Sequence, residues 1–325
     1  MPKRRLLSLA FALALTLALP TLPSPAAAQD SGPVRIYVPF AAGGPSNVVA
    51  RILADLLSAR WGGRAMLVEN RPGAGTIVAT AALAKAPPDG STFMFITNSF
   101  LIDPALNIKL PYDTAKDFAP ISMVATEPVA LVATRSFPAD TIAELVAVAK
   151  AAAAPLNYTS PGPRGVGHLA GEMLQQRASI RMTHINYNGS APALTDVIAG
   201  RVPLMFDVWH SARRYVESGD LKLIAGAGLD PLPGFERKPT IASAFPGFNV
   251  VAFNAAVAPA GVPAPVLARL SADIRAAVGS REFGERTASL GIDAWASTPA
   301  ELETWMRGEM EKWAQIVRQG NIKTE

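Results

Sequence analysis

The chain has 325 residues, of which 50% are hydrophobic and 17% charged, and it contains no cysteine. Residues 1–28 hold three of its 30 basic residues and none of its 26 acidic residues, which leaves 27 against 26 and a net charge of +1 beyond residue 28. This balance, without any run of lysine and arginine, argues against a nucleic-acid-binding protein. Without disulfides the chain depends on its core, and a chain of this length can bury one large core or two smaller ones.

The first 28 residues have the pattern of a secretory signal peptide. Basic residues occupy positions 3–5, an uncharged apolar run covers 6–19, and Ala26–Ala28 provide small residues for cleavage. The pattern predicts cleavage before Gln29 and release of a soluble protein outside the cytoplasm. A membrane anchor is the alternative, but the run is shorter than the ~20 residues that span a bilayer. The absence of cysteine excludes a lipid anchor on an N-terminal thiol.

Strands and helices alternate in the first part of the chain. Apolar runs predict strands at 34–40, 65–69 and 93–97, and helical spacing predicts helices at 46–61 and 75–85. Ser46 is the expected N-cap of the first helix, with Pro45 just outside it. This order predicts a mainly parallel sheet with helices on both faces.

A second alternating set follows an irregular connection at 104–120. Two strands are expected at 121–126 and 129–134, and then a helix at 141–152 with a capping box of Thr141 and Glu144. The next strands are expected at 156–159, 183–187, 202–207 and 221–225, and the next helices at 169–177, 191–199 and 210–218. After a proline- and glycine-rich connection, we expect a strand at 250–257 and helices at 263–278 and 298–317.

These elements predict an α/β fold of two doubly wound domains. The first domain is discontinuous and comprises 29–127 and 250–325, whereas the second comprises 128–249. The chain crosses between them near 125–130 and returns near 248–253. Two such crossings are typical of a hinge between two lobes, with a cleft between the lobes.

Polar, glycine-rich loops follow the predicted strands, at the sheet edge where open α/β proteins bind ligands. The first loop leads into a helix N-terminus, whose N–H groups and dipole favour an anion. Gly43 and Gly44 allow the backbone to approach a ligand closely. An ordinary turn without a ligand is the alternative for this segment. The candidate loops are 40–44, 97–99, 160–165, 187–190 and 206–207.

Several motifs occupy these loops and the segments around them, between residue 34 and about residue 266. They are V-P-F-A-A-G-G, V-E-N-R-P-G-A-G, A-P-P-D-G-S-T, T-N-S, L-P-Y-D-T-A-K-D-F-A-P-I, H-L-A-G-E, Y-N-G-S-A-P-A-L-T-D-V-I-A-G-R-V-P-L-M-F-D and A-P-A-G-V-P-A-P-V. In these motifs the chain resembles the tripartite tricarboxylate transporter solute-binding family, also called Bug receptors.

The resemblance implies a two-lobed periplasmic binding protein, type II-like, that captures a small mono-, di- or tricarboxylate, including aromatic and amino acids. It implies delivery of the ligand to the membrane components of a tripartite transporter. We expect a monomer without catalytic residues, metal or cofactor. The expected ligand-binding residues are Phe40, Ala42, Gly43, Gly44, Ser46, Thr97, Asn98, Ser99, Ser160, Gly162, Arg164, Gly165, Tyr187, Gly189 and Asp207.

Three positions depart from the family pattern. Asn47 replaces a frequent aspartate, residues 162–165 read G-P-R-G where the family has G-N-G-[ST], and Asn188 replaces a frequent lysine. A ligand-facing Arg164 would pair with a second carboxylate or an aromatic face, so Arg164→Ala would weaken a dicarboxylate more than a monocarboxylate. A solvated loop position is the alternative for Arg164.

Other interpretations stay open at this point. Asp207 either faces the ligand or caps the helix expected at His210, and Tyr187 is either a pocket wall or part of the core. The histidines at 168, 184 and 210 fit no metal-binding spacing. A protein that presents its ligand to a membrane sensor kinase would use the same pocket. A secreted hydrolase is disfavoured because the chain has no cysteine nucleophile and no G-x-S-x-G motif.

Overall fold

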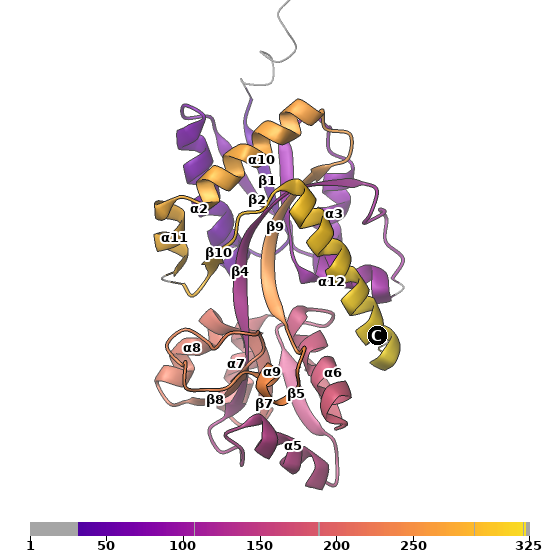
Figure 1. Ribbon diagram of the computed structural model, residues 1–325, viewed down its shortest axis with the longest axis vertical. Helices are drawn as coiled ribbons and strands as arrows, with labels where there is room; N and C mark the ends of the chain where they lie inside the picture. The colour runs from indigo at the N-terminus through magenta and orange to yellow at the C-terminus, as the bar shows by residue number, and fades with distance from the viewer. Residues whose placement is uncertain (1–31, 107, 188, 289, 321, 323–325) are drawn as a thin grey trace, which may run out of the picture. The chain divides into compact units, whose positions relative to one another are not determined.

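The computed structural model describes residues 32–106, 108–187, 189–288, 290–320 and 322 (Figure 1). The predicted signal peptide at 1–28 therefore lies outside the described residues. Strands and helices alternate as expected, in an α/β fold whose first elements are β1 (Val34–Val38), α2 (Pro45–Arg60), β2 (Met66–Asn70), η1 (Ala74–Thr76), α3 (Ile77–Ala84), β3 (Thr92–Ile96), α4 (Asn98–Ile102) and η2 (Asp103–Leu106).

The second half of the chain repeats the alternation. Its elements are β4 (Phe118–Thr134), α5 (Ile142–Ala151), β5 (Leu156–Ser160), α6 (Val166–Ala178), β6 (Met182–Asn186), α7 (Ser190–Ile198), β7 (Leu204–Val208), α8 (Trp209–Glu217), β8 (Leu221–Gly226), α9 (Ile241–Ala244), β9 (Val251–Pro259), α10 (Ala264–Val278), α11 (Arg281–Ala288), β10 (Asp293–Ala294) and α12 (Pro299–Gly320). The predicted capping box is present at α5, where Thr141 accepts a hydrogen bond from the backbone of Glu144.

The strands follow the order β2-β1-β3-β9-β4-β7-β5-β6, with β8 and β10 also paired to β4. β1 is parallel to β2 and β3, and β5 is parallel to β6 and β7. Parallel neighbours place their carboxyl ends at the same edge of a sheet. The loops after β1, β2 and β3 therefore form one group, and the loops after β5, β6 and β7 form another.

β4 is one continuous strand, whereas the sequence predicted two strands at 121–126 and 129–134. It pairs with β9 over Phe118–Pro128 and with β7 and β8 over Val129–Thr134, and β4 and β9 lie side by side (Figure 1). Glu127 and Pro128 interrupt the apolar pattern where β4 changes partners. A proline has no N–H for a ladder, which is tolerated where a pairing ends.

The short elements α9, α11 and β10 were not predicted. Of the eight residues of α11, Phe283 and Thr287 are buried, so helical periodicity hardly shows in its sequence. β10 consists of two exposed residues that pair with β4. Such segments take their structure from neighbouring elements rather than from a pattern of their own.

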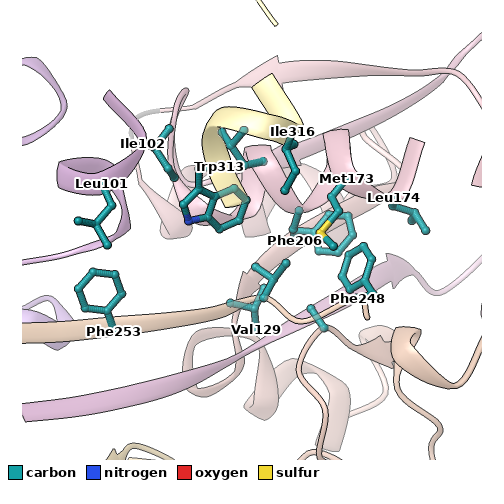
Figure 2. Packing of buried hydrophobic residues seen from close by; sticks show 14 of the residues in the cluster. Leu101, Ile102, Val129, Met173, Leu174, Phe206, Phe248, Phe253, Trp313 and Ile316 are labelled. Carbon is teal, nitrogen blue, oxygen red and sulfur yellow. The ribbon is translucent and has the colours of Figure 1, made fainter. Parts of the chain in front are cut away.

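One continuous group of buried apolar side chains extends from α4 and β9 to α6 and β7 (Figure 2). Trp313 and Ile316 of α12 belong to it, together with Ile102 of α4 and Met173 of α6. The amide of Gln176 on α6 also donates a hydrogen bond of 2.9 Å to the backbone oxygen of Ile316. The last helix therefore packs on elements from both groups of strands.

Gly171, in the H-L-A-G-E motif, allows α6 to pack closely on β5. A Cβ at this position would lie 2.1 Å from Cε2 of Tyr158, whose side chain is fully buried. Gly171→Ala is therefore expected to lower the free energy of unfolding by about 1–3 kcal/mol through overpacking. Urea unfolding measures this effect.

Gly284→Ala provides the matched control. Gly284 lies in α11, and a Cβ there would have no heavy atom within 4 Å. This change should be neutral or stabilise by up to about 1 kcal/mol, since alanine has the higher helix propensity. Equal effects of the two substitutions would contradict the packing described for α6.

Candidate functional site

The loop between β1 and α2 is held by a chain of amide side chains. Asn47 Oδ1 accepts a hydrogen bond of 3.2 Å from the backbone N–H of Gly43. Asn47 Nδ2 donates to Asn70 Oδ1 at 2.8 Å, and Asn70 Nδ2 donates to the backbone oxygen of Phe40, also at 2.8 Å. The Asn47 departure from the family pattern thus has a structural role, because it ties this loop to the end of β2.

The helix after this loop begins one residue earlier than predicted. Gly44 is the N-cap and Pro45 is the first helical residue, so Ser46 lies inside the first turn and is not the cap. Proline suits this position because its fixed φ is helical and its missing N–H has no intrahelical role there. The first intrahelical bond runs from Val48 N to Gly44 O at 3.1 Å, which leaves the N–H groups of Ser46 and Asn47 ahead of it.

The loop after β3 is closely packed. Thr97 is the N-cap of α4, and Thr97 and Ser99 are each 9% exposed. Asn98 is 3% exposed, and its Nδ2 donates to the backbone oxygen of Val251 at 2.9 Å. This side chain therefore connects α4 to β9, so its amide nitrogen is already used within the protein.

The loops after β5 and β6 are joined to each other. The N–H of Gly189 donates to Pro161 O at 2.6 Å, and Ser160 Oγ donates to Gly162 O at 2.9 Å. The Tyr187 hydroxyl donates to Asp196 Oδ2 on α7 at 2.5 Å. The hydroxyls of Ser160 and Tyr187 are thus bonded within the protein, and their predicted contact with a ligand stays untested.

Two stacked histidines contact the loop after β5. The rings of His168 and His184 are 4.1 Å apart, and Ser160 Oγ lies 2.8 Å from His184 Nε2. Burial lowers the pKa of His168 to about 4 and, together with the neighbouring His168, lowers that of His184 to about 3. Both rings are therefore neutral at pH 7. As predicted, His168 lies in the first turn of its helix.

Arg164 links the two groups of loops. Its Nη2 donates to the backbone oxygen of Ala74 at 3.3 Å, and its Nη1 lies 3.6 Å from Oδ1 of Asp103. The residue has φ of 62°, a left-handed conformation that is costly for a side chain larger than glycine. Its backbone N–H donates to His168 Nδ1 at 3.1 Å. Arg164 is thus not a solvated loop residue, since its side chain is 19% exposed.

The sequence analysis missed Asp103, which follows α4 at the start of η2. Its side chain is fully buried, and neither carboxylate oxygen accepts a hydrogen bond from the described residues. Burial raises its pKa to about 6, and the charge of Arg164 opposes that rise. Nothing in the local sequence distinguishes this aspartate from a surface residue, because its burial comes from elements distant in the chain.

Asp207 is buried at the end of β7 and does not cap α8. Its Oδ1 accepts hydrogen bonds from Ser190 Oγ at 3.0 Å and from Val208 N at 2.8 Å, whereas Oδ2 has no partner among the described residues. Burial raises its pKa to about 7. Close by, His210 Nδ1 lies 3.3 Å from Oε2 of the buried Glu127. The N-cap of α8 is Val208, so the capping role that was the alternative for Asp207 is wrong, and its predicted contact with a ligand stays a prediction.

Asp207→Asn is expected to become more stabilising as the pH rises. The folded-state pKa of about 7 exceeds the reference value of 3.8, so the folded protein binds a proton that the unfolded chain releases. The wild type therefore loses stability as the pH rises from about 4 to about 7. The free energy of unfolding of Asp207→Asn, relative to that of wild type, should therefore be about 3 kcal/mol higher at pH 8 than at pH 5.

The histidine pair has the opposite pH dependence, with stability lost as the pH falls below about 6.5, but it contributes equally to both proteins. Its effect therefore cancels in the difference between wild type and Asp207→Asn. Parallel stability curves for the two proteins would contradict a buried, protonatable carboxyl at position 207.

Two features bear on alternative sites in the described part of the chain. A shallow hollow lined by Lys150, Ser179 and Arg181 lies beside α5, and none of the predicted ligand-binding residues lines it. No group of three or more His, Asp or Glu side chains in residues 32–322, outside the gaps, could hold a metal ion.

Within the same residues, no helix is long and apolar enough to cross a membrane.

The α/β fold is that of the periplasmic binding proteins. The profile described as tripartite tricarboxylate transporter family receptor matches residues 49–322. The chain belongs to this family, whose members are solute-binding receptors rather than enzymes. The resemblance stated from the motifs and the predicted fold class are thereby confirmed.

Relatives agree over nearly the whole chain. The UPF0065 protein in the tcbD-tcbE intergenic region of Pseudomonas sp. strain P51 is 33% identical over 296 residues, 89% of this chain and 87% of the relative. Protein BugT of Bordetella pertussis is 30% identical over 294 residues, 90% of each chain.

Solved structures show the same fold. R. palustris Rpa4515 with adipate has a TM-score of 0.81 and 28% identity, over 89% of this chain and 97% of that chain. MatC from Rhodopseudomonas palustris with bound malate has a TM-score of 0.77 and 29% identity, over 87% of this chain and 98% of that chain.

Proposed function

We propose that this receptor captures a small carboxylate at the loops that follow β1, β3, β5, β6 and β7. The observation that carries the proposal is the β1–α2 loop, where hydrogen bonds of the side-chain amides of Asn47 and Asn70 hold the chain at a helix N-terminus. The N–H groups of Ser46 and Asn47 precede the first intrahelical bond there. Fixed N–H donors and the positive end of a helix dipole favour a carboxylate. The solved relatives with adipate and malate support this ligand class.

The remaining predicted residues would surround the ligand. The backbone of 160–165 and of Gly189 would contribute from the second group of loops, and Asp207 would offer its unpaired Oδ2, as a donor when protonated and an acceptor when ionised. Phe40 is 39% exposed and would cover the apolar part of the ligand. Ser160, Tyr187 and Asn98 would act mainly by shaping the loops, since their polar groups bond within the protein.

We further propose two lobes, 29–127 with 250–325 and 128–249, that close on the ligand. The partner change of β4 after Pro128 supports this division. The packing of α12 on both α4 and α6 limits the motion to one that keeps Trp313 and Ile316 in contact with their neighbours. A ligand that contacts both groups of loops would favour the closed form.

The proposed setting is the periplasm, after removal of residues 1–28. There the receptor would act as a monomer and deliver its ligand to the membrane components of a tripartite transporter. The family match and the basic, apolar start of the chain support this proposal. Partner and oligomeric state are tested by co-purification with those components and by light scattering.

A thermal-shift screen of residues 29–325 tests the ligand class. Mono-, di- and tricarboxylates are compared with sugars and polyamines at equal concentrations. A ligand present at about 100 times its Kd should stabilise the folded protein by about 2.7 kcal/mol. Stabilisation by a carboxylate supports the proposal, whereas stabilisation by a sugar or a polyamine alone would overturn it.

A further inference from the structure

Asp103 and Arg164 form an ion pair that joins the two groups of loops. Arg164 Nη1 lies 3.6 Å from Asp103 Oδ1, and Nη2 donates to Ala74 O at 3.3 Å. Asp103 is fully buried, and the Arg164 side chain is 19% exposed. The sequence analysis considered the Arg164 guanidinium as a partner for a ligand. In the structure it lies against a carboxylate of the protein itself.

The guanidinium of Arg164 occupies the space that a side chain at Gly75 would fill. A Cβ at Gly75 would lie 2.5 Å from Arg164 Nη2, and Gly75 has φ of +64°. Ala74 and Thr76, on either side, also have positive φ values of 47° and 92°. The segment that receives the guanidinium is therefore shaped to bring a backbone oxygen and an open space to it.

The Asp103 carboxylate interacts with the rest of the protein mainly through charge. Neither of its oxygens accepts a hydrogen bond from the described residues, and the nearest cation is the guanidinium of Arg164. A buried carboxylate interacts strongly with a nearby charge because water screens it poorly. The pair is therefore close to electrically neutral as seen by a bound ligand.

We propose that Asp103 is a specificity-determining residue that neutralises Arg164, so that this receptor selects carboxylates without a second negative charge. The inference rests on the proposed function. A monocarboxylate at the N-terminus of α2 leaves the pair undisturbed. A second carboxylate at Arg164 would place two negative charges around one guanidinium, which is unfavourable at low dielectric.

The experiment compares matched acids on four proteins. Wild type, Asp103→Asn, Arg164→Met and the double variant are titrated with straight-chain monocarboxylates and dicarboxylates of four to eight carbons. Asp113→Asn is the control, because it removes an equal charge from an exposed, Lys116-paired position. Wild type should prefer the monocarboxylate of each length. Asp103→Asn should raise the ratio of dicarboxylate to monocarboxylate affinity at least tenfold, and the double variant should lose this gain.

The outcomes separate the two proposals. An unchanged ratio in Asp103→Asn, or a wild type that prefers dicarboxylates, overturns the role of Asp103 while carboxylate binding itself stands. A wild type that binds no acid contradicts both proposals, even beside an Asp103→Asn protein that gains dicarboxylates through Arg164. No binding by any variant overturns both. Urea midpoints of the ligand-free proteins add a second test, since additive effects of Asp103→Asn and Arg164→Met would show that the two residues are not coupled.

Discussion

Trp313→Ala is expected to lower the free energy of unfolding by about 3–5 kcal/mol, the usual range for removing a large buried aromatic side chain. Trp313 is fully buried in α12, and it belongs to the apolar group that contains Ile102 of α4 and Met173 of α6 (Figure 2). Its Nε1 also donates to Glu309 Oε2 at 3.0 Å. The substitution leaves a cavity among elements from both groups of strands, so equilibrium unfolding in urea should shift strongly.

Trp295→Ala is the control for this effect. Trp295 is 38% exposed and contacts the ring of Trp305 edge-to-face at 5.8 Å between centroids. Its loss should cost about 1 kcal/mol, since it forfeits mainly one aromatic contact. Similar costs at positions 295 and 313 would contradict the role of α12 as the element that packs on both halves of the chain.

Gly44→Val is expected to weaken ligand binding at least about 100-fold, which corresponds to about 2.7 kcal/mol. Gly44 is the N-cap of α2, and its φ of −78° and ψ of 170° are open to any residue. A valine there would leave the fold intact but place its branched side chain over the N–H groups that the carboxylate requires. Calorimetry with the acid found in the screen measures the loss, and urea unfolding checks the fold.

Two further variants make the result specific. Gly308→Val introduces the same side chain at an exposed position of α12 with nothing within 4 Å, and it should leave binding unchanged. Gly43→Val combines blocked approach with strain, because Gly43 has φ of +87°. It should therefore lose both binding and some stability. Full binding by Gly44→Val would place the carboxylate elsewhere.

The sequence predicted most of the fold because long periodic segments carry their own signal. A stripe of six apolar residues predicted α2, namely Val48, Val49, Ile52, Leu53, Leu56 and Leu57. In the structure Val48 and Leu56 are half-buried and the other four are buried. The division of β4 into two strands was wrong because Glu127 and Pro128 look like a break, whereas the strand pairs with β9 up to Pro128 and with β7 from Val129 onward.

The candidate loops follow strands in the structure as predicted, but the partners of their side chains could not be predicted. Strand order alone indicates which loops share an edge, but hydrogen bonds between distant segments do not show in a pattern. Asn47 appeared only as a departure from a motif, and the structure gives its side-chain amide three hydrogen bonds, with Gly43, Asn70 and Arg51. Asp103 carried no signal, although it faces the guanidinium of Arg164.

The central claim is that this receptor recognises the charge of a carboxylate at the N-terminus of α2. Calorimetry of residues 29–325 with the best acid from the screen and with its primary amide tests the claim most directly, since the two ligands differ only at the carboxylate. Charge-assisted hydrogen bonds to two or more N–H groups predict one binding site and at least about 100-fold weaker binding of the amide. Equal affinity for the acid and its amide would contradict the account.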